Sequence, residues 1–244
     1  MSLPVKTSYQ RILLKLSGEL LSGTDGFGIQ QERCLDVARA VKTIVSHQVE
    51  VGIVIGGGNI FRGIQLTELG LQRSPADQMG MLATMLNGLA LQQALLAIEC
   101  EAKVMSALDC PKVVEPFHWA TARQHMSEGY PVIFVAGTGN PYFTTDTSAA
   151  LRAREMEADV ILKATKVDGV YDRDPLKHSD AVRYEKISYS QVLAEKLQVM
   201  DATAIAMCRD GNIPILVFNM SKLTDTQILS VLSQDHPGTL VTEG

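Results

Sequence analysis

Short apolar runs alternate with longer segments of helical period along most of this chain. Runs rich in branched aliphatic residues predict strands over 11–16, 49–55, 102–106, 132–136, 159–164, 214–218 and 239–242, the last of them at a sheet edge. Apolar positions at helical spacing predict helices over 31–46, 76–98, 119–127, 147–157 and 202–209. Buried strands that alternate with helices predict an α/β fold, a three-layer αβα sandwich with a mainly parallel central sheet.

The predicted helix over 76–98 is unusual because no charged residue occurs between Asp77 and Glu99. That length is sufficient to span a bilayer. Five polar side chains interrupt it, however: Gln78, Thr84, Asn87, Gln92 and Gln93. Such groups are costly in lipid and cheap in a protein interior where they find partners. We therefore expect a helix that is buried or lies at a subunit interface, and no membrane partner.

Composition narrows the choice of partners and compartment. The 244 residues contain no Pro/Ser/Gly-rich linker, so we expect one domain over 1–244. The net charge of −5, with both signs mixed along the chain, argues against a nucleic-acid partner but is compatible with a small anionic ligand. The four cysteines show no zinc or C-x-x-C spacing, and the N-terminus carries no apolar leader, so we expect a cytoplasmic protein.

The most informative stretch follows the predicted strand over 132–136. A glycine-rich turn, residues 137–140, leads into a cluster of hydroxyls and one carboxylate at 144–147. The first turn of a helix has unpaired N–H groups and a partial positive charge, so this join predicts an anion site, with phosphate as the expected ligand. The alternative is an ordinary strand–turn–helix join in which Thr145 or Asp146 is the N-cap.

Other predicted strands end in similar residues. Ligands of parallel sheets lie beyond the carboxyl ends of the strands, so we expect four segments to converge there: 15–18, 56–63, 137–147 and 163–174. The loop 56–63 is not a dinucleotide fingerprint, because Phe61 stands where the third glycine is required, and the chain has no Walker A motif. Three glycines followed within one turn by Arg62 favour phosphate binding over a structural turn.

Two lysines stand near the ends of apolar strands, Lys15 and Lys163. A single such lysine often only extends its head to solvent, but two at one edge indicate paired cations that face a polyanion. Asp168-Gly169 predicts a two-residue hairpin turn, and the segment 171–175 after it fits either a plain surface hairpin or a contact with a nucleotide base. The histidines form no pattern typical of a metalloenzyme, and the chain has no G-x-S-x-G motif of the kind found in hydrolases.

Asp77 is expected in the first turn of the long helix. A carboxylate there either compensates the helix dipole or accepts hydrogen bonds from the hydroxyls of a sugar.

Taken together, these motifs resemble the amino-acid kinase superfamily, with its carbamate kinase-like fold, and within it the bacterial-type uridylate (UMP) kinases. The resemblance covers residues 10–242. It rests on R-I-L-L-K-L-S-G-E (11–19), G-T-D-G-F-G (23–28), V-I-G-G-G-N-I-F-R-G (54–63), D-Q-M-G-M-L-A-T (77–84), A-G-T-G-N-P-Y-F-T-T-D (136–146) and D-V-I-L-K-A-T-K-V-D-G-V-Y (159–171).

The resemblance implies transfer of the γ-phosphoryl group of ATP to UMP in pyrimidine nucleotide and CTP biosynthesis, with UMP bound by the N-terminal part and ATP by the C-terminal part. The implied ATP contacts are Lys15, Leu16, Ser17, Gly18, Gly58, Arg62, Thr165, Tyr171 and Asp174. The implied UMP contacts are Gly57, Asp77, Thr138, Gly139, Asn140, Pro141, Tyr142, Phe143, Thr144 and Thr145. The implied catalytic residues are Lys15, Arg62, Asp146 and Lys163. The three cationic side chains would offset the negative charge of the phosphoryl groups, and Asp146 would orient the lysines.

The resemblance further implies Mg²⁺ that accompanies ATP, held mainly by phosphates and water and by no named protein ligand. It implies a homohexamer built from dimers, for which the uncharged helix would provide a dimer contact, with GTP as activator and UTP as inhibitor. Lys103 and Trp119 fit a GTP site, but Gln92, Leu96 and Tyr130 depart from the basic pattern of GTP-activated members.

Two other functions remain open on the sequence. One is a kinase of the same superfamily that phosphorylates a carboxylate or carbamate; the hydroxyl-rich loop at 138–147 argues instead for an acceptor that carries phosphate. The other is a non-catalytic nucleotide-binding sensor, against which the presence of Lys15, Asp146 and Lys163 argues.

Overall fold

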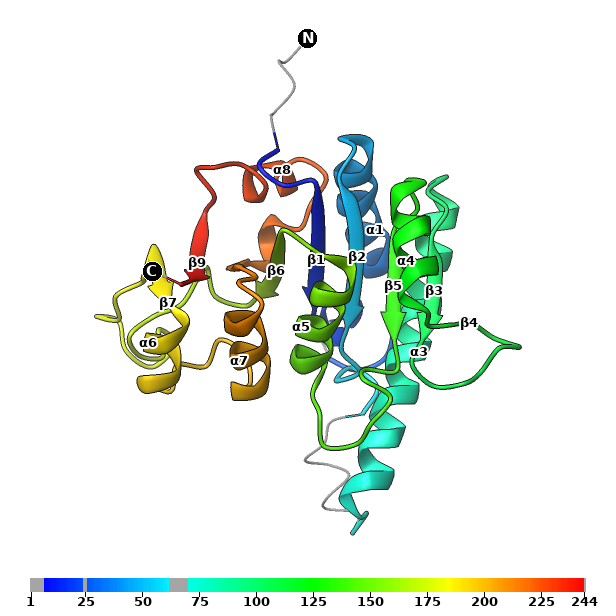
Figure 1. Ribbon diagram of the computed structural model, residues 1–244, viewed down its shortest axis with the longest axis horizontal. Coiled ribbons are helices and arrows are strands. Elements are labelled where there is room, and N and C mark those ends of the chain that lie inside the picture. The colour runs from blue at the N-terminus through cyan, green and yellow to red at the C-terminus, as the bar shows by residue number, and fades with distance from the viewer. Residues whose placement is uncertain (1–6, 24–25, 62–69, 244) are drawn as a thin grey trace.

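The computed structural model describes residues 7–23, 26–61 and 70–243. In this part of the chain a nine-stranded sheet runs in the order β4-β3-β5-β2-β1-β6-β8-β9-β7 (Figure 1). The strands are β1 (Arg11–Leu16), β2 (Glu50–Ile55), β3 (Lys103–Ser106), β4 (Glu115–Pro116), β5 (Val132–Val135), β6 (Val160–Thr165), β7 (Lys186–Ser188), β8 (Ile215–Asn219) and β9 (Gly238–Thr242). Neighbouring strands pair in parallel except β8 and β9, which are antiparallel.

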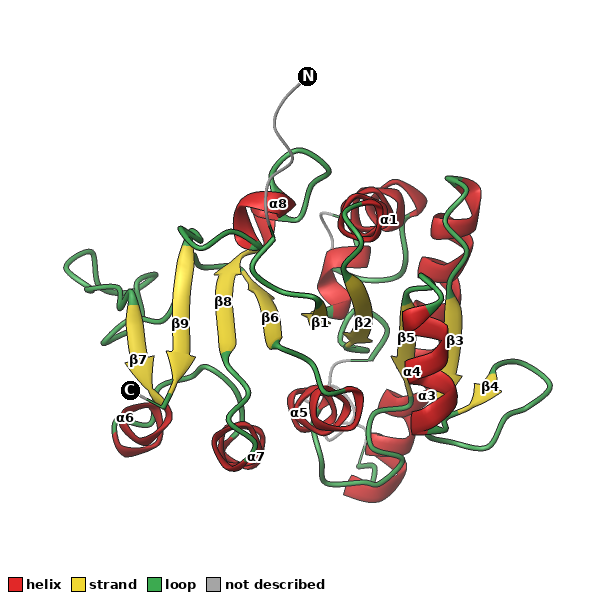
Figure 2. Cartoon of the chain, turned by 45° about the horizontal axis from the view of Figure 1, so that its top comes forward, coloured by secondary structure: helices red, strands yellow, loops and turns green. Residues whose placement is uncertain are grey.

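Helices cover both faces of the sheet, which gives the predicted three-layer α/β architecture (Figure 2). One face carries α1 (Gln31–Ser46), α3 (Arg73–Ala97) and the short α8 (Ile228–Val231). The other face carries α4 (Trp119–Ser127), α5 (Thr145–Met156), α6 (Tyr189–Ala194) and α7 (Ala202–Asp210). Two short 3₁₀ helices, η1 (Gly18–Leu21) and η2 (Met220–Lys222), follow β1 and β8.

The central strands are apolar on both faces, as a covered parallel sheet requires. In β1, Ile12, Leu14 and Leu16 pack into the core beneath α1 and α3, and Leu13 packs into the core on the side of α5. All four side chains are fully buried. The one polar residue of the strand after its first position, Lys15, points to the α5 side, where its ammonium group meets the start of that helix.

Four strands that are consecutive in the sheet, β5, β2, β1 and β6, carry the segments that were predicted to converge. Because they are parallel, their carboxyl ends lie at one edge of the sheet. The long helix α3 begins beyond this edge and runs back along the sheet (Figure 1). The topology therefore brings loops that are far apart in sequence to one place.

The structure corrects two predictions about elements. The strand at 239–242 is not an edge strand, because β9 lies between β8 and β7, and β7 forms the edge. The long helix begins at Arg73, so Asp77 lies in its second turn and not in its first. Among the described residues six short elements were not predicted: β4, β7, α6, α8 and the 3₁₀ helices η1 and η2. Runs of two to six residues leave no periodicity to detect.

Among the described residues, α3 is the one helix long and apolar enough to cross a membrane by length and composition, and half of its most apolar window is buried against the rest of the protein. Thr84, Asn87 and Gln92 find partners within the protein, whereas Gln78 and Gln93 are exposed. Thr84 donates to the backbone of Met81 and accepts from the N–H of Ala136, while Asn87 binds the Gly56 carbonyl. The helix is thus partly a core helix, as its polar residues predict.

Candidate active site

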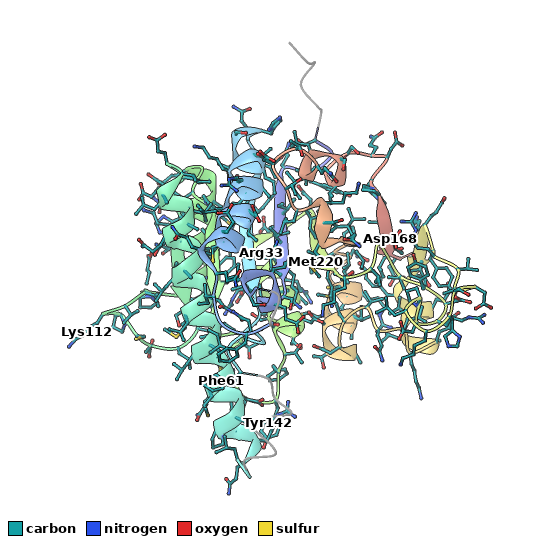
Figure 3. All side chains as sticks on the ribbon, turned by 180° about the vertical axis from the view of Figure 1, so that it is seen from behind. Arg33, Phe61, Lys112, Tyr142, Asp168 and Met220 are labelled. Atoms are coloured by element: carbon teal, nitrogen blue, oxygen red, sulfur yellow. The ribbon has the colours of Figure 1, made fainter. Side chains whose placement is uncertain are left out.

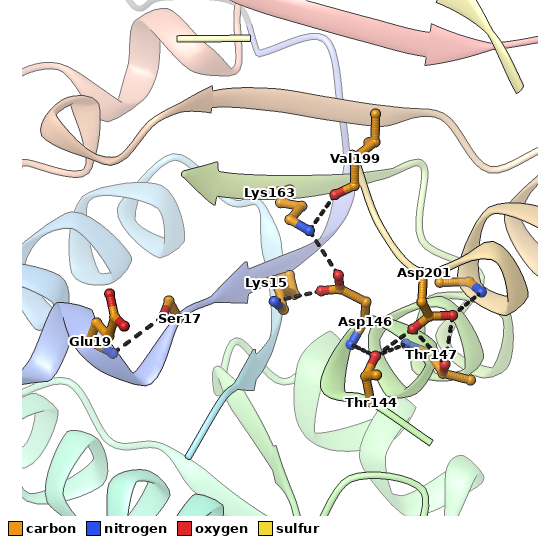
Figure 4. A network of polar contacts seen from close by, with 10 residues as sticks. Lys15, Ser17, Glu19, Thr144, Asp146, Thr147, Lys163, Val199 and Asp201 are labelled. Carbon is orange, nitrogen blue, oxygen red and sulfur yellow. Dashed lines mark hydrogen bonds and ion pairs between the residues drawn. The ribbon is translucent and has the colours of Figure 1, made fainter. Parts of the chain in front are cut away.

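Lys15 and Lys163 lie side by side at the edge where the four loops meet. The register of β1 and β6 pairs them directly, so both side chains leave the sheet on the same face. Lys15 Nζ is 2.5 Å from Asp146 Oδ1, and Lys163 Nζ is 2.8 Å from Asp146 Oδ2 (Figure 4). Lys163 also donates to the backbone carbonyl of Val199. The structure therefore brings together the two lysines and the carboxylate that the sequence predicts.

This lysine–aspartate–lysine cluster is largely withdrawn from solvent: the exposed fractions of the side chains are 12% for Lys15, 16% for Asp146 and 13% for Lys163. Burial alone would raise the pKa of Asp146, but the two ammonium groups outweigh it and hold that pKa below its usual value. Burial and the neighbouring Lys15 charge lower the pKa of Lys163, although Asp146 opposes them. The cluster is a pair of cations held close together by one ionised carboxylate.

Asp146 owes its position to the way α5 begins. The N-cap of α5 is Thr144, whose hydroxyl accepts from the N–H groups of Asp146 and Thr147; the alternatives Thr145 and Asp146 were wrong. A threonine cap with an acidic residue at the second helical position suits the helix dipole. The preceding loop is tightly wound: Ala136 has φ 62° and Gly137 φ 59°, a conformation that costs a non-glycine residue energy and recurs at functional sites.

A pocket of about 350 Å³ opens between this loop, the glycine loop after β2 and the start of α3. It is lined by Gly57, Gly58, Phe61, Ala76, Asp77, Gly80, Met81, Thr84, Gly137, Thr138, Asn140, Phe143, Thr144 and Thr145. Most of the residues predicted to bind UMP therefore line this one pocket. Gly58, predicted to bind ATP, lines this pocket too. Gly57 has to be glycine, because a Cβ there would lie 2.9 Å from the carbonyl of Gly80 in α3.

Three residues predicted to bind UMP, Gly139, Pro141 and Tyr142, belong to the same loop but not to the pocket lining. A Cβ on Gly139 would lie 2.9 Å from the carbonyl of Ala107, so this glycine lets the loop pack against the protein. Tyr142 is 66% exposed. Figure 3 shows Tyr142 and Phe61 at the end of the molecule where α3 begins.

Asp77 links α3 to the loop over 136–144 that precedes α5; we call this segment, which holds most of the predicted UMP contacts, the acceptor-side loop. Arg73, one turn earlier, contacts both of its oxygens through Nε at 2.9 and 2.8 Å. Its Oδ2 also accepts the backbone N–H of Tyr142 at 2.7 Å. Asp77 therefore fixes the loop as well as facing the pocket, a role that neither of the sequence alternatives included.

A second pocket, of about 540 Å³, lies beyond β6. Its lining combines the segment after β6 with the segment between α6 and α7: Thr165, Val167, Gly169, Val170, Tyr171, Asp172, Arg173, Asp174, Pro175, Leu176, Lys177, Glu195, Lys196, Leu197, Gln198, Val199 and Val217. It contains Thr165, Tyr171 and Asp174, three of the residues that the resemblance implies as ATP contacts. The lysine–aspartate–lysine cluster lies between the two pockets, since Lys163 binds Val199 of the larger one and Asp146 follows Thr145 of the smaller one.

Asp168-Gly169 does not form the predicted two-residue hairpin. The strand before it, β6, pairs with β1 and β8, and the nearby antiparallel bridge, between Tyr171 and Arg183, joins two residues that both follow the dipeptide. The side chain of Asp168 instead accepts the hydroxyl of Tyr171 at 2.5 Å and contacts Arg183 at 3.3 Å. These contacts shape the wall of the larger pocket.

The turn after β1 was predicted to hold ATP phosphates. Ser17 caps the 3₁₀ helix η1 by accepting the N–H of Glu19 at 3.3 Å, and the carbonyl of Leu16 accepts the N–H of Gly56. A Cβ on Gly18 would lie 2.4 Å from the Gly56 carbonyl, so glycine is required where the two loops touch. Arg62, predicted to contact ATP, lies outside the described residues.

A buried amide pair lies beneath these loops and was not predicted from the sequence. Asn59 and Asn87 exchange hydrogen bonds of 3.0 and 2.7 Å between their side chains. Asn59 also donates to the carbonyl of Gly28, and Asn87 to that of Gly56. Both side chains are fully buried. The only available signal was the presence of amides among apolar residues.

Asp201 was missed as well. It accepts from the hydroxyls of Thr144 and Thr147, and it caps α7 through the N–H of Ala204 at 2.8 Å (Figure 4). Nothing in the sequence around it marks it beyond its fitness as an N-cap.

The described residues contain no group of three or more His, Cys, Asp or Glu side chains suited to a metal ion. Both oxygens of Asp146 already face lysines. A cation in this site would therefore take most of its ligands from a bound ligand and from water.

The comparisons with known proteins agree with this geometry. The model of the amino acid kinase family matches residues 10–219, and the chain belongs to that family. A uridylate kinase of Protochlamydia amoebophila (strain UWE25) is 61% identical over 240 residues, which cover 98% of this chain and 96% of that protein. Another uridylate kinase, of Acinetobacter baylyi, is 52% identical over 236 residues, 96% and 97% of the two chains.

Solved structures give the same result. The crystal structure of UMP kinase from Bacillus anthracis superposes with a TM-score of 0.92 at 39% identity and covers 96% of each chain. That of UMP kinase from Ureaplasma parvum has a TM-score of 0.90 at 42% identity and covers 96% of this chain and 99% of its own.

Proposed function

We propose that this chain is a UMP kinase, an enzyme that transfers the γ-phosphoryl group of ATP to UMP and releases UDP and ADP. The observation that carries the proposal is the lysine–aspartate–lysine cluster between two pockets. An oxygen of the UMP phosphate attacks the γ-phosphorus, and the bond from that phosphorus to the β,γ-bridging oxygen breaks. The electron pair leaves with ADP, and charge spreads over the γ-oxygens.

The chain's own groups suit this reaction. At about 4 Å, each repulsion between unit charges is worth roughly 4 kcal/mol at an effective dielectric constant of 20. Lys15 and Lys163 offset such repulsion between the two nucleotides and stabilise the charge that develops on the transferring group. Asp146 keeps both ammonium groups in place. No side-chain nucleophile or strong base is required, because positioning and electrostatics provide most of the rate enhancement.

We assign UMP to the smaller pocket and ATP to the larger one. The smaller pocket has backbone and hydroxyl donors from 137–145, which suit a phosphate, and the carboxylate of Asp77, which suits sugar hydroxyls. The larger pocket ends at Val199, beside Lys163, so a triphosphate that leaves it points toward the cluster. UMP is then bound by the N-terminal part and ATP by the C-terminal part of one domain over 1–244. Arg62 completes the proposed catalytic set.

Mg²⁺ enters this proposal with ATP. Phosphate oxygens and water are its preferred ligands, and the donor set of the site fits an ion held mainly by the substrate. When bound, the ion would neutralise part of the charge on the phosphates.

The alternatives have less support. A carboxylate or carbamate kinase would not need a pocket with several phosphate donors, and relatives with the name uridylate kinase span nearly the whole chain. A non-catalytic sensor would have no reason to keep two buried lysines on one carboxylate.

We further propose a homo-oligomer of cytoplasmic subunits, with the hexamer as the expected form, in which α3 contacts a second copy. Leu82, Leu86 and Leu96 are 54%, 51% and 54% exposed along the part of α3 after Asp77, which has no charged residue. Light scattering after size-exclusion chromatography tests this, and a monomer at micromolar concentration would contradict it.

GTP and UTP remain proposed effectors. The exposed ring of Trp119 suits a base, but Lys103 is engaged by Glu101 at 2.6 Å and lies over the ring of Tyr130 at 4.4 Å. An activating nucleotide has to displace those contacts, so we expect weak activation by GTP.

A coupled assay tests the proposed function. ATP is offered with UMP, CMP, dUMP, aspartate and acetylglutamate, each with and without GTP and UTP. We expect rapid ADP release with UMP and little with the two carboxylates. Faster turnover with a carboxylate acceptor, or none with any acceptor, contradicts the proposal.

A further inference from the structure

Asp201 lies where the wall of the larger pocket runs into helix α7. Residues 195–199, just before it, line that pocket. Oδ1 of Asp201 accepts the backbone N–H of Ala204 at 2.8 Å and so caps α7. A nucleotide that packs against 195–199 therefore contacts a segment whose end is fixed at Asp201.

The same carboxylate also holds the beginning of α5. Its Oδ2 accepts the hydroxyl of Thr144, and Thr147 Oγ1 lies 3.1 and 2.9 Å from its two oxygens. Thr144 in turn caps α5. Figure 4 shows one carboxylate that joins the first turns of two helices. The partial positive charge at both helix ends stabilises its negative charge.

The two sides of this link reach different pockets. Thr144 lines the smaller pocket and stands two residues before Asp146, which holds both lysines. On the other side, the carbonyl of Val199 accepts from Lys163. The segment 195–201 therefore connects three places: it lines the larger pocket, binds the cluster through the Val199 carbonyl and binds the acceptor-side loop through the Asp201 carboxylate.

We propose that Asp201 is a positioning residue that couples nucleotide binding in the two pockets; this inference rests on the UMP kinase function proposed above. ATP or ADP in the larger pocket restricts the motion of residues 195–199. Because the carboxylate of Asp201 binds the hydroxyl of Thr144, the position of Thr144 is restricted as well. The acceptor-side loop is then already ordered when UMP arrives. Because the ordering cost is met by the first nucleotide, the second binds more tightly.

The coupling is measured by titration calorimetry as the ratio of the UMP dissociation constants without and with saturating MgADP. ADP fills the larger pocket but lacks the γ-phosphoryl group, so neither turnover nor repulsion between that group and UMP contributes. For the unmodified protein we expect a ratio of about 5 or more. The same ratio is expected when ADP is titrated without and with UMP, because binding linkage is reciprocal.

Asp201→Asn is the informative variant. Asparagine caps helices as well as aspartate does, so its Oδ1 keeps the bond from Ala204, but the amide nitrogen that replaces Oδ2 cannot accept the hydroxyl of Thr144. We expect cooperative unfolding to be retained and the ratio to fall below about 2. Asp210→Asn is the matched control: it removes the same charge from the exposed end of α7, where Asp210 contacts the neighbouring Arg209. We expect Asp210→Asn to show the same ratio as the unmodified protein.

Thr144→Val and Thr144→Ser repeat the test from the α5 side. We expect the ratio to fall below about 2 in the valine variant and to stay at the value of the unmodified protein in the serine variant, which retains the hydroxyl. These two variants provide the test if Asp201→Asn does not fold. A ratio near 1 in the unmodified protein, or an undiminished ratio in Asp201→Asn, overturns the inference. If the unmodified protein forms no UDP from ATP and UMP, the proposed function fails instead, which is a distinct result.

Discussion

Lys15 and Lys163 are register partners on the adjacent parallel strands β1 and β6, and the carboxylate of Asp146 lies between their ammonium groups. Two like charges this close are stable only with a counter-charge. Asp146 supplies it in the free protein, and a triphosphate supplies more when ATP binds. The arrangement prepares a binding place for phosphoryl groups before the substrate arrives.

Removal of Lys163 tests the role of the pair in catalysis. Lys163→Ala is expected to lower kcat by ~10²–10³-fold, the effect of removing one group that stabilises transition-state charge. Steady-state kinetics with ATP and UMP measure it. The control is Lys186→Ala, which removes an exposed lysine from the edge strand β7 and leaves kcat within about twofold. Near-normal kcat in Lys163→Ala would mean that this lysine does not face the transferred group.

Asp77 tests the assignment of the pockets. Asp77→Ala removes a pocket carboxylate and the acceptor of the Tyr142 N–H, so the KM for UMP is expected to rise by about 10-fold or more. The KM for ATP should change much less. Asp77→Asn keeps an acceptor for Tyr142 and is expected to give an intermediate value. A larger effect on the KM for ATP would reverse the two pocket assignments.

The lowered pKa of Asp146 predicts how stability depends on pH. A carboxyl with a depressed folded-state pKa stabilises the fold above its unfolded pKa of about 3.9, and the contribution is lost as pH falls toward the folded value. Asp146→Asn is therefore expected to lower the free energy of unfolding by about 3 kcal/mol at neutral pH, because two ammonium groups lose their counter-charge. Urea titrations should show a constant difference between the two proteins down to about pH 5 and a shrinking one below it. A difference that grows as pH falls is the contrary result.

The amide pair beneath the glycine loops should matter for stability. Asn87→Leu leaves the side chain of Asn59 and the carbonyl of Gly56 without their partner. Each unsatisfied buried group costs about 1–3 kcal/mol, so we expect a loss of at least about 2 kcal/mol in the free energy of unfolding. Gln93→Leu changes an exposed amide on the same helix and serves as the control. Equal stability of the two variants would show that the pair contributes nothing.

Much of this architecture could be predicted from the sequence. The strands that carry Lys15 and Lys163 are apolar runs, and the rule that parallel strands present ligands at their carboxyl ends placed their loops together. The period of the apolar positions located the long helices to within a few residues. The six short elements could not be predicted, because a run of two to six residues shows no period.

The finer parts of the site could not be predicted, because they depend on contacts between distant segments. Thr144, Thr145 and Asp146 are all acceptable N-caps, and the hydroxyl of Thr144 is selected by the geometry of the turn. Asp201 is distant from Thr144 in sequence, so its contact with that hydroxyl exists only once both helices are packed. Such choices belong to tertiary structure and leave no local pattern.

A crystal structure with a bisubstrate analogue, in which adenosine and uridine are joined through a chain of phosphates, tests the central claim most directly. We predict adenosine in the pocket beyond β6, uridine in the pocket beside Asp77, and the Nζ atoms of both Lys15 and Lys163 within about 3 Å of phosphate oxygens. Phosphates bound away from this cluster, with the two lysines still paired only with Asp146, would contradict it.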